Sequence, residues 1–416
     1  MLFVGDDWAE DHHDLVVIDN NQKVVARARV PEGPAGITAF TDVIARAALK
    51  TVTSDDDLDD DALEVMVGIE LNHGPWVQAL VAAGYQVFGV DPLQAKRFRE
   101  SWSNSKTKSD SGDALGLAEL VRSRHRTLTT VGADSEGSAA IRILAREHQR
   151  AVWDRTRQTN RLRSTLREYH PAIVTIAAKY DLPLHDKTIL GLLTLAPTPA
   201  AGAAITVRQV LPLLARRHDK DAKAAWIVQA LQQPQLPVGP EIVEAYAITV
   251  RAATRVISSA SSHIAELEEQ VNAHFSRHPD AEIYLSQPGI GQVIGARLCG
   301  EYGDDSTRFR TAKDRRNFAQ TSPLTRQSGK LRIVCARKAG NDWALDAAIL
   351  QANAAIMHDK YAHAYYRRQR DRGVKHNAAL RQLANKLTGI LHGCLARHHR
   401  YDPAIAWANA DLEVPA

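Results

Sequence analysis

The sequence contains few cysteines and no long apolar run. Three of its 416 residues are cysteines, Cys299, Cys335 and Cys394, and their wide spacing includes no CxxC pair. This pattern favours neither a zinc knuckle nor a disulfide framework, so we expect reduced thiols in a cytoplasmic protein. No segment approaches the roughly 20 uncharged apolar residues of a membrane span, and the N-terminus lacks the pattern of a signal peptide. These absences favour a globular cytoplasmic protein without a membrane partner.

The charges are unevenly distributed along the chain. The formal net charge is +4, which alone says little about partners. Residues 55–61, however, contain six aspartates in seven positions, a run typical of a solvated loop. Without this run the chain is markedly more basic, which is compatible with a nucleic-acid partner.

The first 130 residues alternate between patterns typical of strands and of helices. The expected strands cover 2–8, 13–18, 23–30, 65–69 and 85–90, and the expected helices cover 31–52, 74–83 and a segment starting at Pro92. The first three strands form a meander, and no glycine-rich turn follows the first of them. The order therefore favours an RNase H-like mixed α/β sheet in a domain spanning 1–130, rather than a Rossmann fold.

The middle of the chain is predicted to be helical. Long amphipathic, coiled-coil-like helices are expected at 137–169 and 242–274, within a scaffold or oligomerisation region that spans 131–280. The first of these helices carries eight arginines. They fit either a solvated charged helix or a surface that follows a phosphate backbone.

The last part of the chain, 281–416, is expected to form a mainly helical domain. Long helices are predicted at 342–358 and 376–399, with a loop around Ser328 between them and the start of the domain. The sequence PGIG at 288–291 predicts a hairpin between two short helices. Ser328 precedes a glycine, and a turn serine is the default interpretation of such a pair.

Four carboxylates stand where strands end or helices begin. Asp7 follows the first expected strand and Glu70 follows the strand at 65–69, so in one sheet their side chains approach each other. Asp110 and Asp113 are three residues apart at an expected helix start, which places both on one helical face. Clustered carboxylates repel one another unless a cation relieves the repulsion, and Mg²⁺ prefers such oxygen ligands. The pattern therefore predicts a magnesium site, where two ions can clamp a phosphodiester under attack.

The residues alone leave alternatives to this site. Asp6 competes with Asp7, and Asp91, which also follows a strand, fits the same geometry nearly as well. Asp110 also suits a helix N-cap, with Asp113 as an ordinary acid of the first turn.

Two features of the last domain suggest contacts with nucleic acid. Gly289 and Gly291 allow backbone N–H groups to approach a phosphate at a helix start, although a plain helix–helix turn explains them equally well. Arg367, Arg368 and Arg370 follow two tyrosines. This mixture suits phosphate contacts and stacking on unpaired bases, or a packed helix whose arginines extend into solvent.

Several segments together resemble the DEDD transposases of bacterial insertion-sequence family 110, a group that includes the pilin-gene invertases. The segments are VGDDWA at 4–9, GIE at 68–70, TKSDSGDA at 107–114, SQPGIGQVIGARL at 286–298, the stretch 308–330, AGN at 339–341 and the stretch 365–387. The resemblance implies that Asp7, Glu70, Asp110 and Asp113 bind Mg²⁺ or Mn²⁺. Asp6 departs from it, because that position is usually apolar in the family.

The resemblance also implies an activity and a second site. It suggests a RuvC-like N-terminal domain and a helix-hairpin-helix-like motif in the C-terminal transposase domain. Ser328 is similar to the serine that attacks DNA in the family, and its neighbours Arg326 and Lys330 are expected to bind DNA. The four carboxylates and Ser328 would then form two halves of a composite site.

The partners implied by the resemblance are donor and target DNA and a guide RNA of the bridge type, encoded by the element. A homodimer or tetramer at the bacterial nucleoid would cut and rejoin the DNA. The main alternative is a RuvC-like, metal-dependent nuclease that resolves branched DNA by hydrolysis, without a role for Ser328. A second alternative is a non-catalytic nucleic-acid scaffold.

Overall fold

The computed structural model describes most of the chain and divides it into two compact units. The described residues are 1–51, 64–70, 74–102, 110–128, 130–131, 134–214, 219–328 and 331–408, so the acidic run at 55–61 lies outside them. One unit comprises Met1–Asp134 with Asp304–Arg308, and the other comprises Ser135–Gly303 with Phe309–Ala416. In the described part of the chain, no helix is long and apolar enough to cross a membrane.

The first unit is built on a mixed five-stranded sheet with the order β3-β2-β1-β4-β5. Its strands are β1 (Leu2–Trp8), β2 (His12–Ile18), β3 (Val24–Pro31), β4 (Val65–Ile69) and β5 (Gln86–Gly89). The first three pair antiparallel as a meander, and β4 and β5 run parallel to β1. The expected mixed α/β sheet at the N-terminus is confirmed, including its order of strands and helices along the chain.

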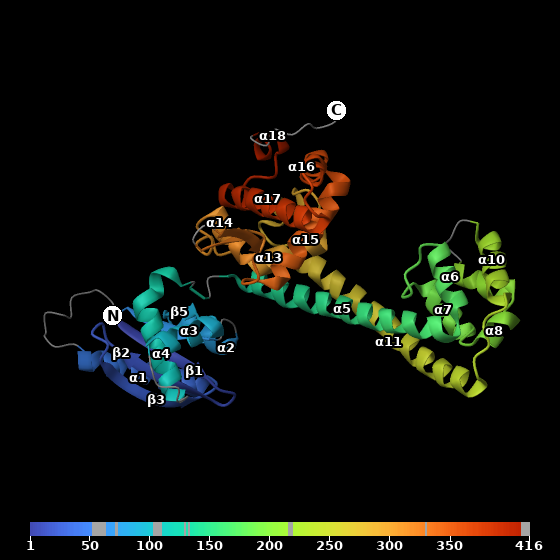
Figure 1. The fold of residues 1–416 in the computed structure, drawn as a ribbon. Coiled ribbons are helices and arrows are strands. Elements are labelled where there is room, and N and C mark those ends of the chain that lie inside the picture. The colour runs from blue at the N-terminus through green and yellow to red at the C-terminus, as the bar shows by residue number, and fades with distance from the viewer. Residues whose placement is uncertain are drawn as a thin grey trace. The chain divides into compact units, whose positions relative to one another are not determined.

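Helices cover both faces of this sheet (Figure 1). They are α1 (Pro34–Thr51), α2 (Pro75–Ala82), α3 (Pro92–Trp102), α4 (Asp110–Arg124) and a short 3-10 helix, His125–Thr127. Successive strand residues point to opposite faces. Accordingly, Leu2 and Val4 of β1 pack in one cluster with α1 and α2, whereas Phe3 packs in another with α4. The alternation therefore places the apolar residues of β1 against one helix layer or the other.

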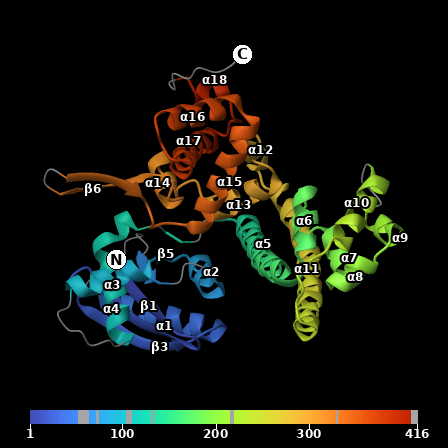
Figure 2. The same ribbon diagram turned by 45° about the vertical axis from the view of Figure 1, so that its right-hand side comes forward.

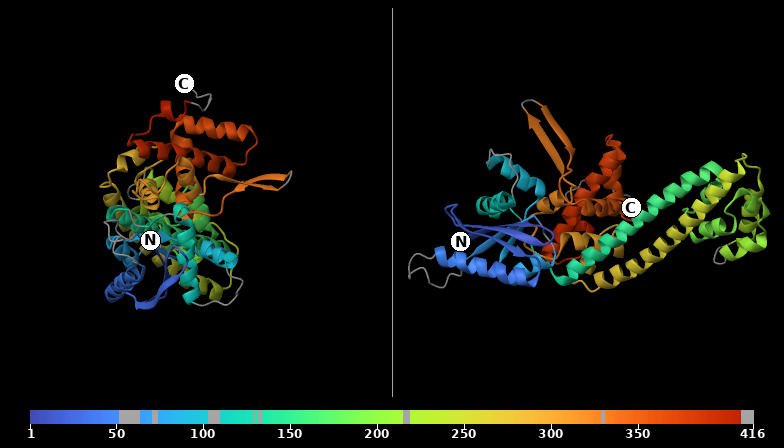
Figure 3. Two further views of the ribbon diagram at one scale, coloured as in Figure 1. Left: turned by 90° about the vertical axis from the view of Figure 1, so that its left-hand side faces the viewer. Right: turned by 90° about the horizontal axis from the view of Figure 1, so that it is seen from below.

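Two long helices run side by side through the second unit. They are α5 (Glu136–Tyr169) and α11 (Pro240–Phe275), and the right-hand view of Figure 3 shows them next to each other. Ser135 caps α5 by accepting a hydrogen bond from the backbone N–H of Ser138. The long helices expected at 137–169 and 242–274 are therefore present, and they pair with each other.

A bundle of short helices packs against one end of this pair. The helices are α6 (Pro171–Lys179), α7 (Lys187–Leu195), α8 (Pro199–Ala204), α9 (Val207–Val210), α10 (Lys220–Gln232) and a 3-10 helix, Leu211–Leu214. Their core includes Leu166 of α5 and Val250 of α11, so the bundle and the long helices share one apolar cluster.

The C-terminal part of the second unit is a separate helical cluster. Its helices are α12 (Ala281–Leu285), α13 (Gln292–Tyr302), α14 (Ala312–Phe318), α15 (Asp342–His358), α16 (Lys360–Asp371), α17 (His376–Arg397) and α18 (Pro403–Ala406). A row of fully buried alanines, among them Ala344, Ala348 and Ala352, lets α15 approach α13 and α17 closely. Cys299 lies in this core, and all three cysteines are free thiols.

A two-stranded ribbon extends from this helical cluster (Figure 2). It consists of β6 (Pro323–Ser328) and β7 (Leu331–Ala336), which pair antiparallel as a sheet of their own. The expectation of a loop around Ser328 is therefore wrong, because Ser328 is the last residue of β6. Ile333 and Val334 of β7 are β-branched and compatible with extended backbone, and the pairing of β7 with β6 forms the ribbon.

Candidate active site

A polar cavity of about 410 Å³ lies in the first unit where β1 and β4 end and α3 and α4 begin. It brings together three of the four expected carboxylates. Its lining residues are Asp7, Trp8, Ala9, His12, Asp14, Glu70, Pro92, Lys96, Arg99 and Asp113. The fourth expected carboxylate belongs to Asp110, the first residue of α4, whose side chain is outside the described set.

Strand alternation separates Asp7 from Asp6. Asp7 lines the cavity, whereas Asp6 is fully buried on the opposite face of the sheet. There the Asp6 carboxylate accepts hydrogen bonds from Trp76 Nε1 at 2.8 Å and from His13 Nδ1 at 2.7 Å. Asp6 thus has a complete structural role in the core beneath α2.

A buried histidine holds this opposite face together. His13 stacks on Trp76 with ring centroids 3.7 Å apart, and its Nε2 lies 2.6 Å from Glu32 Oε2. Burial disfavours the charged imidazole, but the hydrogen bonds and charges of Asp6 and Glu32 outweigh burial and raise the pKa of His13. Only a protonated ring can donate to both carboxylates at once.

Two glycines set the distance between the sheet and α4. Gly5 and Gly68 are register partners on β1 and β4, and each precedes a cavity carboxylate by two residues. A Cβ atom at Gly5 would lie 1.7 Å from the carbonyl oxygen of Ala114, the residue after Asp113. The absence of a side chain at Gly5 therefore allows the start of α4 to lie against the end of β1.

Basic side chains share the cavity with the carboxylates. Arg99 of α3 forms an ion pair with Asp113, and Lys96, three residues earlier, lines the same cavity. Arg29 donates two hydrogen bonds to Asp14, at 2.9 and 2.7 Å, and these bonds lower the pKa of Asp14. The cavity therefore contains both acidic and basic side chains, and the Asp14 carboxylate is held ionised by Arg29.

The donor chemistry of the cavity suits a hard divalent cation, because Asp7, Glu70 and Asp113 offer carboxylate oxygens. Within the described residues, however, no three histidine, cysteine or acidic side chains are close enough together to hold one ion. Arg99 is engaged with Asp113. Binding of a cation through Asp113 Oδ1 would therefore require Arg99 to release that oxygen.

Asp91, the alternative candidate, caps a helix. Its Oδ1 accepts hydrogen bonds from the backbone N–H groups of Leu93 at 2.9 Å and Gln94 at 3.2 Å. These bonds satisfy donors that are free at the start of α3. Asp91 does not line the cavity, which agrees with a structural role.

The two glycines of PGIG have different surroundings. Gly289 adopts a φ of +74°, and a Cβ there would lie 2.4 Å from the carbonyl oxygen of Gln351 in α15. Gly291 is exposed at the N-cap of α13, with no atom near the place of a Cβ. Gly289 is thus explained by packing against α15, and Gly291 is the accessible member of the pair.

The C-terminal candidates are only partly visible. Ser328 ends β6 and Arg326 lies two residues earlier on the same strand, but their side chains are outside the described part. Lys330 lies outside the described residues altogether. The backbone register pairs Ser328 with Leu331 and Arg326 with Ile333.

The arginines of α16 differ in their environment. Arg367 and Arg370 are exposed, and Arg370 donates to the carbonyl of Val374 at 2.9 Å. Arg368 is half-buried with its guanidinium 5.8 Å from the centre of the Tyr365 ring. Tyr365 itself packs against Trp407, so its ring takes part in the core rather than forming a free stacking surface.

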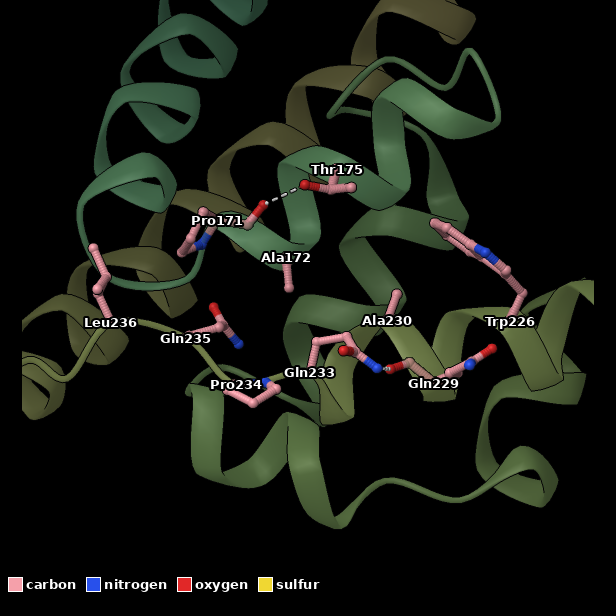
Figure 4. A pocket seen from close by; sticks show the side chains of 10 residues that line it. All are labelled: Pro171, Ala172, Thr175, Trp226, Gln229, Ala230, Gln233, Pro234, Gln235 and Leu236. Carbon is pink, nitrogen blue, oxygen red and sulfur yellow. Dashed lines mark hydrogen bonds between the residues drawn. The ribbon is translucent and has the colours of Figure 1, made fainter.

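A second, larger cavity of about 640 Å³ lies among the short helices (Figure 4). Its walls come from α6, α10 and residues 233–236. The side chains drawn there include Trp226 and three glutamines but no acidic or basic group. This cavity offers no acid–base or metal chemistry.

Four residues with charged or titratable side chains line the carboxylate cavity but were not among the predicted site residues: His12, Asp14, Lys96 and Arg99. The spacing of Lys96 and Arg99 on one face of α3 was a usable signal, because Pro92 already marked the start of that helix. Asp14 is the register partner of Asp7 across β1 and β2. If the register of β1 and β2 were predicted with an error of two residues, Asp14 would not be placed opposite Asp7.

The comparisons with known proteins agree on one family. A family model described as a transposase, DEDD_Tnp_IS110, matches residues 4–171, and a second, Transposase IS116/IS110/IS902 family, matches residues 281–367. The mini-circle protein of Streptomyces coelicolor that is named as a transposase for IS117 is 36% identical, over 98% of this chain and 97% of the relative. The 42 kDa protein of insertion element IS900 from Mycobacterium paratuberculosis is 28% identical over 96% of both chains.

These matches cover both units of the structure. The DEDD designation of the first model refers to acidic residues and suggests dependence on a divalent metal. A transposase also binds DNA as its substrate. The chain therefore belongs to the IS110/IS116 family of insertion-sequence transposases, enzymes that cleave and rejoin DNA.

Proposed function

We propose that Asp7, Glu70, Asp110 and Asp113 bind Mg²⁺ or Mn²⁺ in an RNase H/RuvC-like domain and that Ser328 is the nucleophile of the transposase. The observation that carries the metal proposal is the cavity shared by Asp7, Glu70 and Asp113. Asp110 precedes Asp113 by one helical turn at the start of α4, which supports adding it to the set. The order β3-β2-β1-β4-β5, with helices on both faces, supports the RuvC-like assignment.

Bound metal would supply positive charge at the phosphate under attack and at the oxygen that leaves. The protein would contribute the ligand oxygens of Asp7, Glu70 and Asp113, fixed by strand ends and a helix start. Lys96 and Arg99 would bind the DNA backbone at the rim of the same cavity, because both line it with positive charge.

The proposed chemistry is a transesterification that conserves the phosphodiester bond. The Ser328 hydroxyl attacks phosphorus, a serine–phosphorus ester forms, and one bond from phosphorus to a deoxyribose oxygen breaks. The serine proton passes to a general base or to water, and the released sugar oxygen takes up a proton. In the reverse step, a sugar hydroxyl of the new partner strand attacks the ester and frees Ser328, so rejoining needs no external energy source.

We further propose that an element-encoded RNA of the bridge type selects donor and target DNA, and that subunits of a homodimer or tetramer assemble the site. The pairing of α5 with α11 supports a scaffold role for 131–280, between a catalytic domain at 1–130 and a transposase domain at 281–416. Exposed Gly291, Arg367 and Arg370 support nucleic-acid contacts by the last domain, where α12 and α13 flank the hairpin-like turn. A DNA substrate would place the protein at the nucleoid.

The metal proposal is tested by measuring DNA strand cleavage at increasing concentrations of Mg²⁺. Asp113→Asn should abolish cleavage at all metal concentrations and leave DNA binding intact, whereas the matched variant Asp91→Asn, at a helix cap, should retain metal-dependent cleavage. Normal cleavage by Asp113→Asn would contradict the assignment. Metal-dependent cleavage without any covalent protein–DNA link would instead favour the hydrolytic nuclease.

A further inference from the structure

The β6–β7 ribbon exposes apolar side chains on both of its faces and the basic side chain of Arg332 on one of them. All residues of β7 except Cys335 are exposed, including Leu331 (62%), Ile333 (49%) and Val334 (61%). A two-stranded ribbon without a third strand or a covering helix is marginally stable by itself. Its length and exposure therefore indicate that the ribbon contacts a partner.

The base of the ribbon is firmly connected to the helical cluster. Arg337 donates from Nε to Ser322 Oγ at 3.2 Å, and Ser322 Oγ donates to Asn317 Oδ1 of α14 at 2.6 Å. Cys335 Sγ lies 3.4 Å from the carbonyl oxygen of Leu324 across the two strands. The ribbon is thus anchored at its root while its outer residues extend away from the helices (Figures 2 and 3).

The charge of the ribbon is complementary to nucleic acid. Residues 323–336, which span the ribbon, contain three lysines and arginines and no acidic residue, and Arg337 and Lys338 follow directly. This uniform sign contrasts with α5, where Arg150 forms an ion pair with Glu147 and Arg157 with Asp154. A surface with this charge attracts phosphates and gains affinity by releasing counterions.

The register divides the ribbon into two chemically different faces. Thr325 pairs with Val334 and Gln327 pairs with Arg332, so these four residues share one face. All four are exposed, and none has a side-chain hydrogen bond to the described residues. The other face carries Leu331, Ile333 and the register position of Ser328.

We propose that the face formed by Thr325, Gln327, Arg332 and Val334 enters the major groove of duplex DNA and contacts base edges. Arginine suits guanine, glutamine suits adenine, and methyl groups suit the methyl group of thymine. The major groove of B-form DNA admits a two-stranded ribbon, whereas the deep and narrow groove of A-form RNA does not. The protein therefore recognises a few base pairs directly, in addition to any sequence selected by a guide.

This inference goes beyond the proposed function and does not depend on which group attacks DNA. It requires only that the transposase acts on duplex DNA.

The inference is tested by selecting preferred duplexes from a random DNA library with the full chain, without RNA or divalent metal. The wild type should enrich a short sequence. Arg332→Lys should lose the preference at one position by about 5- to 150-fold, the range of one bidentate base contact. Arg208→Lys, at an exposed arginine of α9, and Leu331→Ser, on the other ribbon face, should keep it. Absence of any enriched sequence, or an equal loss in Arg208→Lys, would overturn the proposal.

Two further measurements separate this proposal from its alternatives. Arg332→Ala should weaken binding to B-form DNA but not to duplex RNA of the same sequence, and equal weakening of both would indicate a general polyanion surface instead. On the selected duplex, without RNA or divalent metal, a photocrosslinking amino acid at position 334 should link to DNA bases. The same group at position 331 should not, and a reversed result would overturn the assignment of the faces.

Discussion

Gly5 and Gly68 are register partners on neighbouring parallel strands, and a side chain at either position would collide with α4. Each glycine is followed two residues later by a cavity carboxylate, Asp7 or Glu70. The close approach that the glycines permit also brings Asp113 to the same strand ends. The same two glycines therefore allow α4 to pack on the sheet and allow Asp7, Glu70 and Asp113 to meet at one cavity.

Replacement of Gly5 should damage both stability and activity. A Cβ there would lie 1.7 Å from the Ala114 carbonyl oxygen, so Gly5→Ala should force α4 away and destabilise the fold by about 1–3 kcal/mol, as overpacking does. The rate of DNA cleavage by the Gly5→Ala protein that remains folded should also be lower than the wild-type rate. Thermal unfolding and a cleavage assay on the same preparation measure the two effects.

Gly68 and Gly116 provide the graded controls for that experiment. Gly68→Ala meets the movable Val121 side chain at 2.5 Å and should be milder than Gly5→Ala. Gly116, inside α4, has open space around the Cβ position, so Gly116→Ala should stabilise the protein by up to about 1 kcal/mol. If all three variants behaved alike, the close approach of α4 would not be the cause.

Asp6 and Asp7 should respond differently to the same substitution. Asp6→Asn removes the charge buried beside His13 and should destabilise the fold by up to about 3–5 kcal/mol. Asp7→Asn should leave the unfolding transition nearly unchanged and abolish metal-dependent cleavage. Urea unfolding and cleavage rates distinguish the two roles, and an active, destabilised Asp7→Asn would reverse the assignment.

This pair also illustrates what the sequence can predict. Two adjacent acids at a strand end must point to opposite faces, so the two-residue period that joins Gly5 to Asp7 selects Asp7 once the helix layers are known. Lys96 and Arg99 could not be placed in the same way. Their proximity to Asp113 depends on how α3 and α4 pack on the sheet, and no local sequence pattern predicts that packing.

Arg99 should compete with metal for Asp113. The guanidinium of Arg99 occupies Asp113 Oδ1 and repels a nearby cation, so Arg99→Gln should raise the affinity for Mg²⁺ in the absence of DNA by about two- to fivefold. The matched variant Arg97→Gln removes an exposed arginine of α3 that does not line the cavity. Calorimetric titration should find no change in Arg97→Gln, and a lower affinity in Arg99→Gln would contradict competition.

The pH dependence of stability should carry the signature of His13. Its pKa is raised in the folded protein, so the protonated ring contributes stability that is complete below the unfolded pKa of about 6.5. This stability is lost as pH rises through the raised folded value. Glu32→Gln should lower the pKa of His13 and reduce the stability difference between pH 6 and pH 8.

Urea unfolding across this range, together with an NMR titration of His13, measures the effect. Glu10→Gln, at an exposed glutamate of the same unit, is the matched control and should preserve the wild-type profile. A His13 pKa that did not change in Glu32→Gln would show that Glu32 has no part in the shift.

The β6–β7 ribbon is a second feature that the sequence did not predict. The segment around Ser328 was expected to be a loop, because Ser-Gly favours a turn, and the strand character of β6 and β7 arises from their mutual pairing. An isolated ribbon buries little surface, so its hydrophobic pattern does not show the alternation that identifies strands in a sheet with one buried face. The resemblance implies a chemical role for Ser328, which stays a prediction, and implies nothing about the strand geometry at that residue.

The most direct test of the account is the fate of Ser328 during strand cleavage. Purified protein, supercoiled donor DNA and the element RNA are mixed with Mg²⁺, quenched in denaturant, digested and analysed by mass spectrometry. A phosphodiester link between DNA and the peptide that contains Ser328 is predicted, together with its absence in Ser328→Ala. Cleaved DNA without any covalent adduct, or an adduct that persists in Ser328→Ala, would contradict the proposed nucleophile.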